Sequence, residues 1–204
     1  MHQTGHFGVI LAGGRALRMG GGDKGLRHLN DKPMLRHVVD RLAPQVRAMA
    51  LNANGPADRF ATFALPVLPD SLPGFPGPLA GILAAMDWTA AQGARAVVTV
   101  AADTPFFPAD LVATFDTARG PSGPCLAATP HRDGGLDWHP TFGLWPVDLR
   151  HSLRVALQNG QRKVLSWALQ HGATAAVFPS DPDTFFNVNT VEDLAIARQR
   201  AAQT

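Results

Sequence analysis

The sequence predicts one α/β domain: a single doubly wound, mainly parallel sheet with helices on both faces. Three observations lead to this prediction. Apolar runs that resemble buried strands alternate with helical apolar repeats along the chain, a pattern typical of a parallel sheet covered by helices. No linker, composition shift or fixed-period repeat divides residues 1–204. A chain of 204 residues is also long enough to bury a core without disulfides.

The first strand and the first helix flank a glycine-rich loop. Residues 7–12, FGVILA, form a continuous apolar run, which is typical of a strand buried on both faces. After the loop, Pro33 suits the first turn of a helix. Leu35, Val38 and Leu42 then repeat with helical spacing, so we expect a helix of about three turns.

The strand and helix signals continue to the end of the chain. Apolar runs predict further strands, and helical repeats predict the helices between them. Thr190 followed by Asp193 predicts a capped start of a last helix, which ends near Arg200. Ligands of such sheets bind outside the carboxyl ends of the strands, so polar residues directly after strands are the candidates for function. The expected strands are residues 46–52, 65–69, 95–102, 124–129 and 173–178, and the helical repeats lie at 79–86, 111–115 and 149–157.

Composition and charge exclude several classes of protein. The net charge is +2, without a run of like charges, and the chain has no Tyr, so we do not expect nucleic acid as a partner. A single cysteine, Cys125, allows no intrachain disulfide and favours a reducing, cytoplasmic location. The apolar run near the start is far shorter than a membrane span of about 20 residues, so we expect neither export nor membrane contact. Glutamate occurs only at Glu192, so a catalytic carboxylate is expected to be an aspartate.

The loop at residues 11–26 reads LAGGRALRMGGGDKGL. Its glycines expose backbone N–H groups that a polyphosphate can approach closely, and Arg18 and Lys24 add positive charge. A G-x-G-x-x-G match is present, but it begins about eight residues after the strand, so it does not fit a dinucleotide fingerprint. The P-loop pattern also fails, because Lys24 precedes Gly25. A flexible connector is the alternative. Asp23 would weaken phosphate binding unless it pairs with a cation.

The segment LAGGxxxRMGGxDKGL resembles the signature of the sugar-nucleotidyltransferase-like superfamily. In this form it resembles the molybdenum cofactor guanylyltransferase family. Together, the matching segments cover the chain from residue 7 to 199. The resemblance implies a Rossmann-like nucleotidyltransferase fold that transfers GMP from GTP to the phosphate of molybdenum-bearing molybdopterin and releases pyrophosphate. The further segments that agree, in order, are DSLPGFPGPLAGILAAM, AADTPF, HPTFGLW, GQRKV and FFNVNTVEDL.

The resemblance also implies roles for residues in the N-terminal half. It implies Mg²⁺ held by Asp103, which follows the run VVTVAA and should therefore lie at the carboxyl edge of the sheet. Mg²⁺ takes one or two protein carboxylates and completes its shell with phosphates and water; a turn or helix-cap aspartate is the alternative. Lys24, Arg18 and Asp103 are the implied catalytic residues. The implied GTP-binding residues are Leu11, Ala12, Gly13, Gly14, Lys24, Asn52, Asp70 and Asp103.

The C-terminal part is expected to hold the second substrate. Arg162 and Lys163 are adjacent cations at a predicted helix start, which suits an anionic group. Asn187 and Asn189 alternate along an extended segment and so face the same side; they either read a pterin edge or tie down a loop. By resemblance, these four residues bind molybdopterin. His139 either lines this pocket or is structural.

We therefore expect an Mg²⁺-dependent nucleotidyltransferase, with GTP and the metal in the N-terminal half of one domain and molybdopterin in its C-terminal part. The expected partners are GTP, molybdenum-molybdopterin and, transiently, proteins that deliver molybdopterin or accept the product. Two alternatives stay open. The first is a related nucleotidyltransferase that uses CTP or a sugar phosphate. The second is a non-catalytic nucleotide-binding module, which would have no use for a metal-binding carboxylate.

Overall fold

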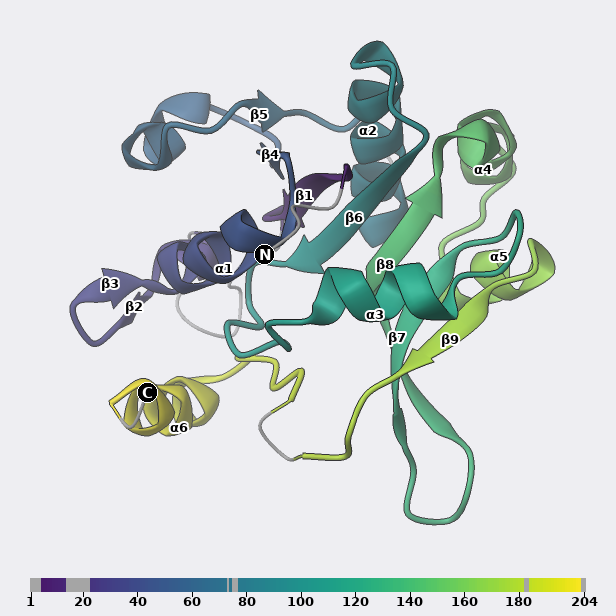
Figure 1. Ribbon diagram of the computed structural model, residues 1–204. Coiled ribbons are helices and arrows are strands. Elements are labelled where there is room, and N and C mark those ends of the chain that lie inside the picture. The colour runs from purple at the N-terminus through teal and green to yellow at the C-terminus, as the bar shows by residue number, and fades with distance from the viewer. Residues whose placement is uncertain (1–4, 14–22, 73, 75–76, 182–183, 203–204) are drawn as a thin grey trace.

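The computed structural model describes residues 5–13, 23–72, 74, 77–181 and 184–202. Its centre is a seven-stranded sheet with the strand order β5-β4-β1-β6-β8-β7-β9 (Figure 1). A separate antiparallel ribbon pairs β2 with β3. The strands are β1 (Phe7–Leu11), β2 (His28–Leu29), β3 (Lys32–Pro33), β4 (Ala48–Asn52), β5 (Val67–Leu68), β6 (Ala96–Ala101), β7 (Cys125–Pro130), β8 (Leu136–Pro146) and β9 (Thr174–Val177).

Most strands of the large sheet run parallel. β1 is parallel to both β4 and β6, β5 is parallel to β4, and β9 is parallel to β7. Among the described strands of this sheet, β8 alone runs antiparallel to its neighbours, β6 and β7. The expected mainly parallel sheet is confirmed, and each apolar run predicted as a strand overlaps one of its strands.

The sequence reasoning did not predict β8, although this strand has 11 residues. The segment contains a glycine and two prolines, which interrupt the apolar alternation of a strand. The pairing with β7 accommodates Pro140: Leu126 pairs with Gly143, whereas the next residue, Ala127, pairs with His139. The residues between these pairs form a bulge, which interrupts the regular ladder of hydrogen bonds. The missing N–H of proline therefore costs no ladder hydrogen bond there.

Helices cover both faces of the sheet. On one face, buried side chains of α1 (Met34–Leu42) and α3 (Leu111–Ala118) join Ile10 of β1. On the other face, helices α2, α4 and α5 pack with Val9. Neighbouring residues of β1 thus point to opposite faces, as a doubly wound sheet requires. Within the described part of the chain, every helix is too short or too polar to span a bilayer. The remaining helices are α2 (Pro78–Ala91), α4 (Arg150–Gln158), α5 (Val164–Gln170) and α6 (Val191–Ala201), with short 3₁₀ helices η2 (Lys24–Leu26), η3 (Ala43–Gln45), η4 (Ala57–Phe63) and η5 (Val147–Leu149).

The last helix, α6, begins with the expected cap. Thr190 Oγ1 accepts a hydrogen bond from the backbone N–H of Asp193 at 3.1 Å, and Asp193 Oδ2 accepts one from the backbone N–H of Thr190 at 2.9 Å. This reciprocal pair satisfies two backbone donors at the start of the helix. Leu194 of α6 packs against Leu29 of β2, so the C-terminal helix lies beside the ribbon that follows the glycine-rich loop (Figure 1).

The carboxyl ends of β4, β1 and β6 form one edge of the sheet. Leu11 pairs with Asn52 on one side and Ala101 on the other. Beyond the ladder, Ala12 N donates to Asn52 O at 2.8 Å, and Ala102 N donates to Leu11 O at 3.1 Å. The start of the glycine-rich loop is therefore held between two neighbouring strand ends.

Candidate active site

Lys24 lies at the centre of a polar cluster at this edge. Its Nζ donates hydrogen bonds to Asp103 Oδ2 at 2.6 Å, to Asn189 Oδ1 at 2.5 Å and to Asn187 Oδ1 at 3.3 Å. Three separate segments meet here: Lys24 begins η2, Asp103 follows β6, and the two asparagines precede α6. We call these four residues the lysine cluster.

The buried ammonium group of Lys24 is fully satisfied within the lysine cluster. The residue is only 9% exposed, and a buried cation requires an opposite charge and hydrogen-bond acceptors. Asp103 supplies the charge, and an ammonium has three N–H donors, which match the three oxygen atoms in contact with it. The cluster therefore holds a positive charge at a fixed position.

The segment that carries Asn187 and Asn189 is anchored on both sides. Val188 is completely buried, and its backbone N–H donates to Asp103 O at 2.9 Å. Asp193 Oδ2 accepts the backbone N–H of Asn189 at 2.8 Å. This hydrogen bond, followed by those from Thr190, holds the pKa of Asp193 below its usual value. The helix cap of α6 thus also fixes Asn189, and both amides point to the same side, as expected from their spacing.

Asn52 and Asp70 form a second cluster at the same edge. Asn52 is 4% exposed, and its Nδ2 donates to Asp70 Oδ1 at 3.0 Å and to Leu68 O at 3.1 Å. Asn54 donates to Asp70 Oδ2 at 2.7 Å and accepts the backbone N–H of Asp70 at 2.9 Å. The structure brings the two predicted residues together. The sequence reasoning missed Asn54. The available signal was its spacing of two residues from Asn52, which places both amides on the same side of an extended segment.

Gly81 of α2 allows Asn52 to occupy its position. A Cβ atom on Gly81 would lie 2.2 Å from Asn52 Oδ1 and 3.0 Å from Leu11 Cδ2. A side chain there would displace the amide, so Gly81 is a positioning residue that the sequence reasoning missed. A glycine inside the apolar repeat PLAGILAAM was the signal, because an internal helical glycine often marks close packing.

The structure describes both ends of the glycine-rich loop. Ala12 is buried and Gly13 is exposed, directly beyond β1. Gly14 and Arg18 lie outside the described residues. Asp23 forms an ion pair with Arg59 Nε at 2.5 Å, so a cation compensates its charge. Without such a pair, this carboxylate would weaken the binding of phosphates beside it.

Arg162 and Lys163 lie apart from the lysine cluster. They directly precede α5, which is on the opposite side of Figure 1 from α6. Arg162 Nη1 donates to the backbone oxygens of Leu157 and Gln161 at 3.1 and 2.8 Å. The four residues expected to bind molybdopterin therefore do not gather at one point.

His139 supports the segment that leads to the two asparagines. Its ring stacks on Phe185 with 4.3 Å between the centroids, and its Nε2 lies 3.2 Å from Thr129 Oγ1. Burial lowers the pKa of His139, which favours the neutral imidazole. These contacts are structural. They place His139 against Phe185, which comes two residues before Asn187 in the chain.

The chemistry of the donor set fits a divalent metal that also binds phosphates. Asp103, Asn187 and Asn189 all present oxygen atoms to one cationic group, and oxygen is the ligand type that Mg²⁺ prefers. Within the described residues, no group of three or more His, Cys, Asp or Glu side chains could hold a metal. A metal at this edge would thus depend on substrate phosphates and water to complete its shell.

Comparison with known proteins agrees with this geometry. Residues 8–175 match the model of the MobA-like NTP transferase domain. The molybdenum cofactor guanylyltransferase of Bradyrhizobium sp. (strain ORS 278) is 48% identical over 199 residues, covering 96% of this chain and 92% of that protein. That of Cereibacter sphaeroides is 46% identical over 191 residues, covering 94% of each. The crystal structure of molybdopterin-guanine dinucleotide biosynthesis protein A from Archaeoglobus fulgidus has a TM-score of 0.72 at 20% identity, over 97% of this chain and 100% of that one.

Proposed function

The chain belongs to the MobA-like NTP transferase family, and we propose that it transfers GMP from GTP to the phosphate of molybdenum-bearing molybdopterin. The products are molybdopterin guanine dinucleotide and pyrophosphate. Nucleotidyl transfer in molybdenum cofactor synthesis follows from the relatives, which carry that name at 48% and 46% identity over nearly the whole chain. A related enzyme that uses CTP or a sugar phosphate is not favoured by these relatives.

We assign GTP to the edge formed by β4, β1 and β6. The triphosphate lies along the glycine-rich loop, where backbone N–H groups face its oxygens and the positive charge of Lys24 attracts them. Asn52 and Asp70 contact the nucleoside, since they form one hydrogen-bonded unit beside the start of the loop. Leu11, Ala12, Gly13, Gly14 and Arg18 complete this binding region in the proposal.

The proposed metal is Mg²⁺, and Asp103 would hold it. When bound, Mg²⁺ neutralises charge on the triphosphate oxygens. The carboxylate of Asp103 is 23% exposed, and it follows β6 at the edge where the phosphates are proposed to lie. One carboxylate on the protein is enough for a cation that shares its shell with a nucleotide.

The second substrate is proposed to approach from the C-terminal side of the cluster. Asn187 and Asn189 contact the pterin or its phosphate, and Arg162 and Lys163 attract an anionic part of the molecule from the α5 side. We thus propose a single domain over residues 1–204, with GTP and metal in its N-terminal half and molybdopterin in its C-terminal part. The lysine cluster is the point at which the two parts meet.

The reaction needs alignment and charge neutralisation rather than a general base. An oxygen of the molybdopterin phosphate attacks the α-phosphorus of GTP. The bond from that phosphorus to the bridging oxygen breaks, and pyrophosphate leaves with the electron pair. The attacking oxygen is already an anion, so no proton has to be removed. Lys24 holds a fixed positive charge where negative charge is spread over the phosphate oxygens, which is how such transition states are stabilised.

One observation carries the proposal: Lys24 of the loop region contacts Asp103 at 2.6 Å and Asn189 at 2.5 Å. This contact unites the proposed phosphate, metal and pterin residues around one atom. A binding module would not require a carboxylate beside the phosphate-binding lysine, because that carboxylate weakens anion binding unless a metal or a reaction makes use of it.

The test is a competition assay with purified protein, molybdopterin carrying molybdenum, Mg²⁺ and equal amounts of GTP and CTP. We expect pyrophosphate release and a dinucleotide product that contains guanine. Equal incorporation of cytosine would refute the guanine selectivity, and tight GTP binding without pyrophosphate release would favour the non-catalytic module. Replacing Mg²⁺ by other divalent ions in the same assay tests the metal assignment.

Two further parts of the proposal concern the cell. Molybdopterin reaches the enzyme by transient contact with a delivering protein, and the product leaves to acceptor proteins in the same way. The reaction takes place in the cytoplasm, for which the single cysteine, Cys125, is the supporting observation.

A further inference from the structure

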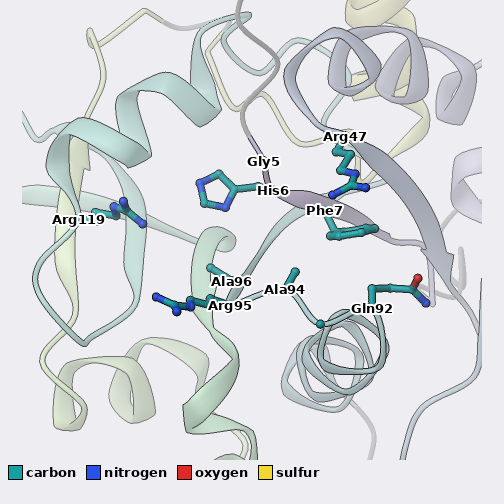
Figure 2. A pocket seen from close by; sticks show the side chains of 10 residues that line it. Gly5, His6, Phe7, Arg47, Gln92, Ala94, Arg95, Ala96 and Arg119 are labelled. Atoms are coloured by element: carbon teal, nitrogen blue, oxygen red, sulfur yellow. The ribbon is translucent and has the colours of Figure 1, made fainter.

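A pocket lies at the opposite edge of the sheet from the lysine cluster, where β4, β1 and β6 begin (Figure 2). Phe7 pairs with Ala48 of β4 and Val97 of β6, so Arg47 and Arg95 come just before the two strands that flank β1. β1 separates this pocket from the loop start by about 13 Å, at ~3.3 Å per residue. The pocket is therefore distinct from the proposed reaction site.

Three arginines line the pocket: Arg47, Arg95 and Arg119. The described lining residues include no aspartate or glutamate. Arg119 lies 3.7 Å from Asp116, and the same carboxylate contacts His6 at 2.8 Å. The guanidinium group of Arg47 lies over the ring of Phe7 at 5.9 Å, a contact that supplies no carboxylate.

Two of these guanidinium groups have no acidic partner in the part of the chain that the structure describes. Over residues 5–13, 23–72, 74, 77–181 and 184–202, no carboxylate forms an ion pair with Arg47 or Arg95. The C-terminal ends of α2 and α3 also lie near the pocket, and each carries about half a negative charge. Three guanidinium charges exceed the charge of Asp116 and both helix ends together, so the pocket is positive.

The backbone holds the three arginines in place before any ligand arrives. Arg47 N donates to His6 O at 2.8 Å, Arg95 O accepts from Val147 N at 2.8 Å, and Arg119 N donates to Phe115 O at 2.9 Å. These bonds fix the point from which each side chain starts, whereas the guanidinium groups still lose rotamer freedom when they close on a ligand. Only the backbone of the pocket is thus preorganised.

We propose that this pocket binds a small anion that carries two or more phosphate groups. Guanidinium groups form paired hydrogen bonds with phosphate oxygens. Figure 2 shows Arg95 and Arg119 on one side of His6 and Arg47 on the other, so the positive charge is spread over more than one position. The volume is about 360 Å³, at the lower end of the ~300–1,000 Å³ usual for small-molecule sites. A compact diphosphate suits this volume better than a bulky ligand does.

The probe is inorganic pyrophosphate, titrated into the full-length protein without divalent metal and followed by NMR of backbone amides. We expect saturable shifts at Gly5, Gly93 and Ala94, which line the pocket. The shifts should persist in Lys24→Ala, which weakens any binding at the reaction site. Inorganic phosphate, with one phosphate group, should bind more weakly than pyrophosphate.

Arginine variants give the decisive comparison. Arg95→Gln should weaken pyrophosphate binding at the pocket about tenfold or more, the effect of losing hydrogen bonds to a charged group. Arg95→Lys should lose less, because lysine keeps the charge but not the paired geometry. Arg132→Gln is the matched control, since Arg132 is exposed on the β7–β8 connection. It should bind as the wild type does.

Several outcomes would overturn the proposal. Absence of saturable shifts at the pocket amides means that no such site exists. Equal weakening by Arg95→Gln and Arg132→Gln means that general surface charge explains the binding. Equal affinity for phosphate and pyrophosphate means that one anionic group is enough, which refutes the assignment of a multiply phosphorylated ligand. None of these results depends on whether the protein transfers GMP.

Discussion

Replacement of Gly81 by alanine should weaken GTP binding indirectly, because the new side chain would displace Asn52. The new Cβ would lie 2.2 Å from Asn52 Oδ1, so the amide must move by roughly 1 Å to reach ordinary contact distance, and the contacts of the buried side chain would be disturbed. Asn52 Nδ2 would then lose its hydrogen bonds to Asp70 at 3.0 Å and Leu68 at 3.1 Å.

The expected size follows from these two hydrogen bonds. Leaving a buried polar group unsatisfied costs about 1–3 kcal/mol, which is roughly a 5- to 150-fold increase in the Kd for GTP if Asn52 holds the nucleoside. The helix itself should gain stability, because alanine is preferred over an internal glycine by about 1 kcal/mol. This gain offsets part of the stability lost with the two hydrogen bonds. Weaker GTP binding in a protein that still unfolds cooperatively close to the wild-type temperature would therefore separate displacement of Asn52 from general damage.

A double-mutant cycle provides the control. GTP affinity is measured by isothermal titration calorimetry for the wild type, Gly81→Ala, Asn52→Ala and the double variant. In the Asn52→Ala background the two nearest Asn52 atoms are gone, and the added Cβ meets Leu11 Cδ2 at 3.0 Å, the end of a flexible side chain. The second substitution should then cost little, and the cycle should show strong coupling. Wild-type affinity in Gly81→Ala, or two fully additive losses, would refute the reasoning.

The remaining predictions test the charges, the stacked histidine and the helix cap. Asp103→Asn should keep the fold and slow pyrophosphate release by on the order of 10² or more; a near-normal rate with Mg²⁺ would contradict the metal assignment. Lys24→Ala should raise the Kd for GTP roughly tenfold or more, whereas Lys32→Ala, at an exposed position, should bind normally; identical titrations would remove the phosphate role. Burial lowers the pKa of His139 from 6.5, so the unfolded chain binds the proton more readily than the folded one does. Stability from the neutral form is present above pH 6.5 and is lost as the pH falls through the lowered pKa. In urea unfolding, His139→Gln should lose less stability on acidification, and an unchanged pH dependence would refute this. Asp193→Ala should cost about 0.5–2 kcal/mol through loss of the cap and also slow transfer by releasing Asn189; thermal unfolding and rate assays check both effects, and a destabilised variant of normal rate would separate the cap from the site.

The sequence predicted the part of the site that depends on the ends of parallel strands. Asn52 and Asp103 follow apolar runs, and because parallel strands end at one edge, their meeting at that edge required no further information. The cap of α6 was also visible, because Thr190 and Asp193 interact across only three residues. These features depend on local patterns and on the regular geometry of a sheet.

Other features depend on the folded arrangement and could not be derived in this way. β8 contains Pro140, whose tolerance becomes clear only from the bulge against β7. The role of Gly81 depends on the distance at which α2 crosses β4. Asn187 and Asn189 were expected in a substrate-binding region away from GTP, yet both contact Lys24. Spacing predicted that their amides share a side but could not predict which residue they face.

The contact between Lys24 and Asn189 spans 165 positions and therefore has a consequence for the order of folding. All nine described strands end by Val177, so every one of them is synthesised before the two asparagines. At ~5–20 residues per second, Asn189 follows Lys24 out of the ribosome by roughly 10–30 s. Closing so long a loop comes late for entropic reasons. A nascent chain that stops between Val177 and Asn187 would carry every described strand but lack two of the three oxygens around the ammonium, so the reaction centre can assemble only after the two asparagines are added.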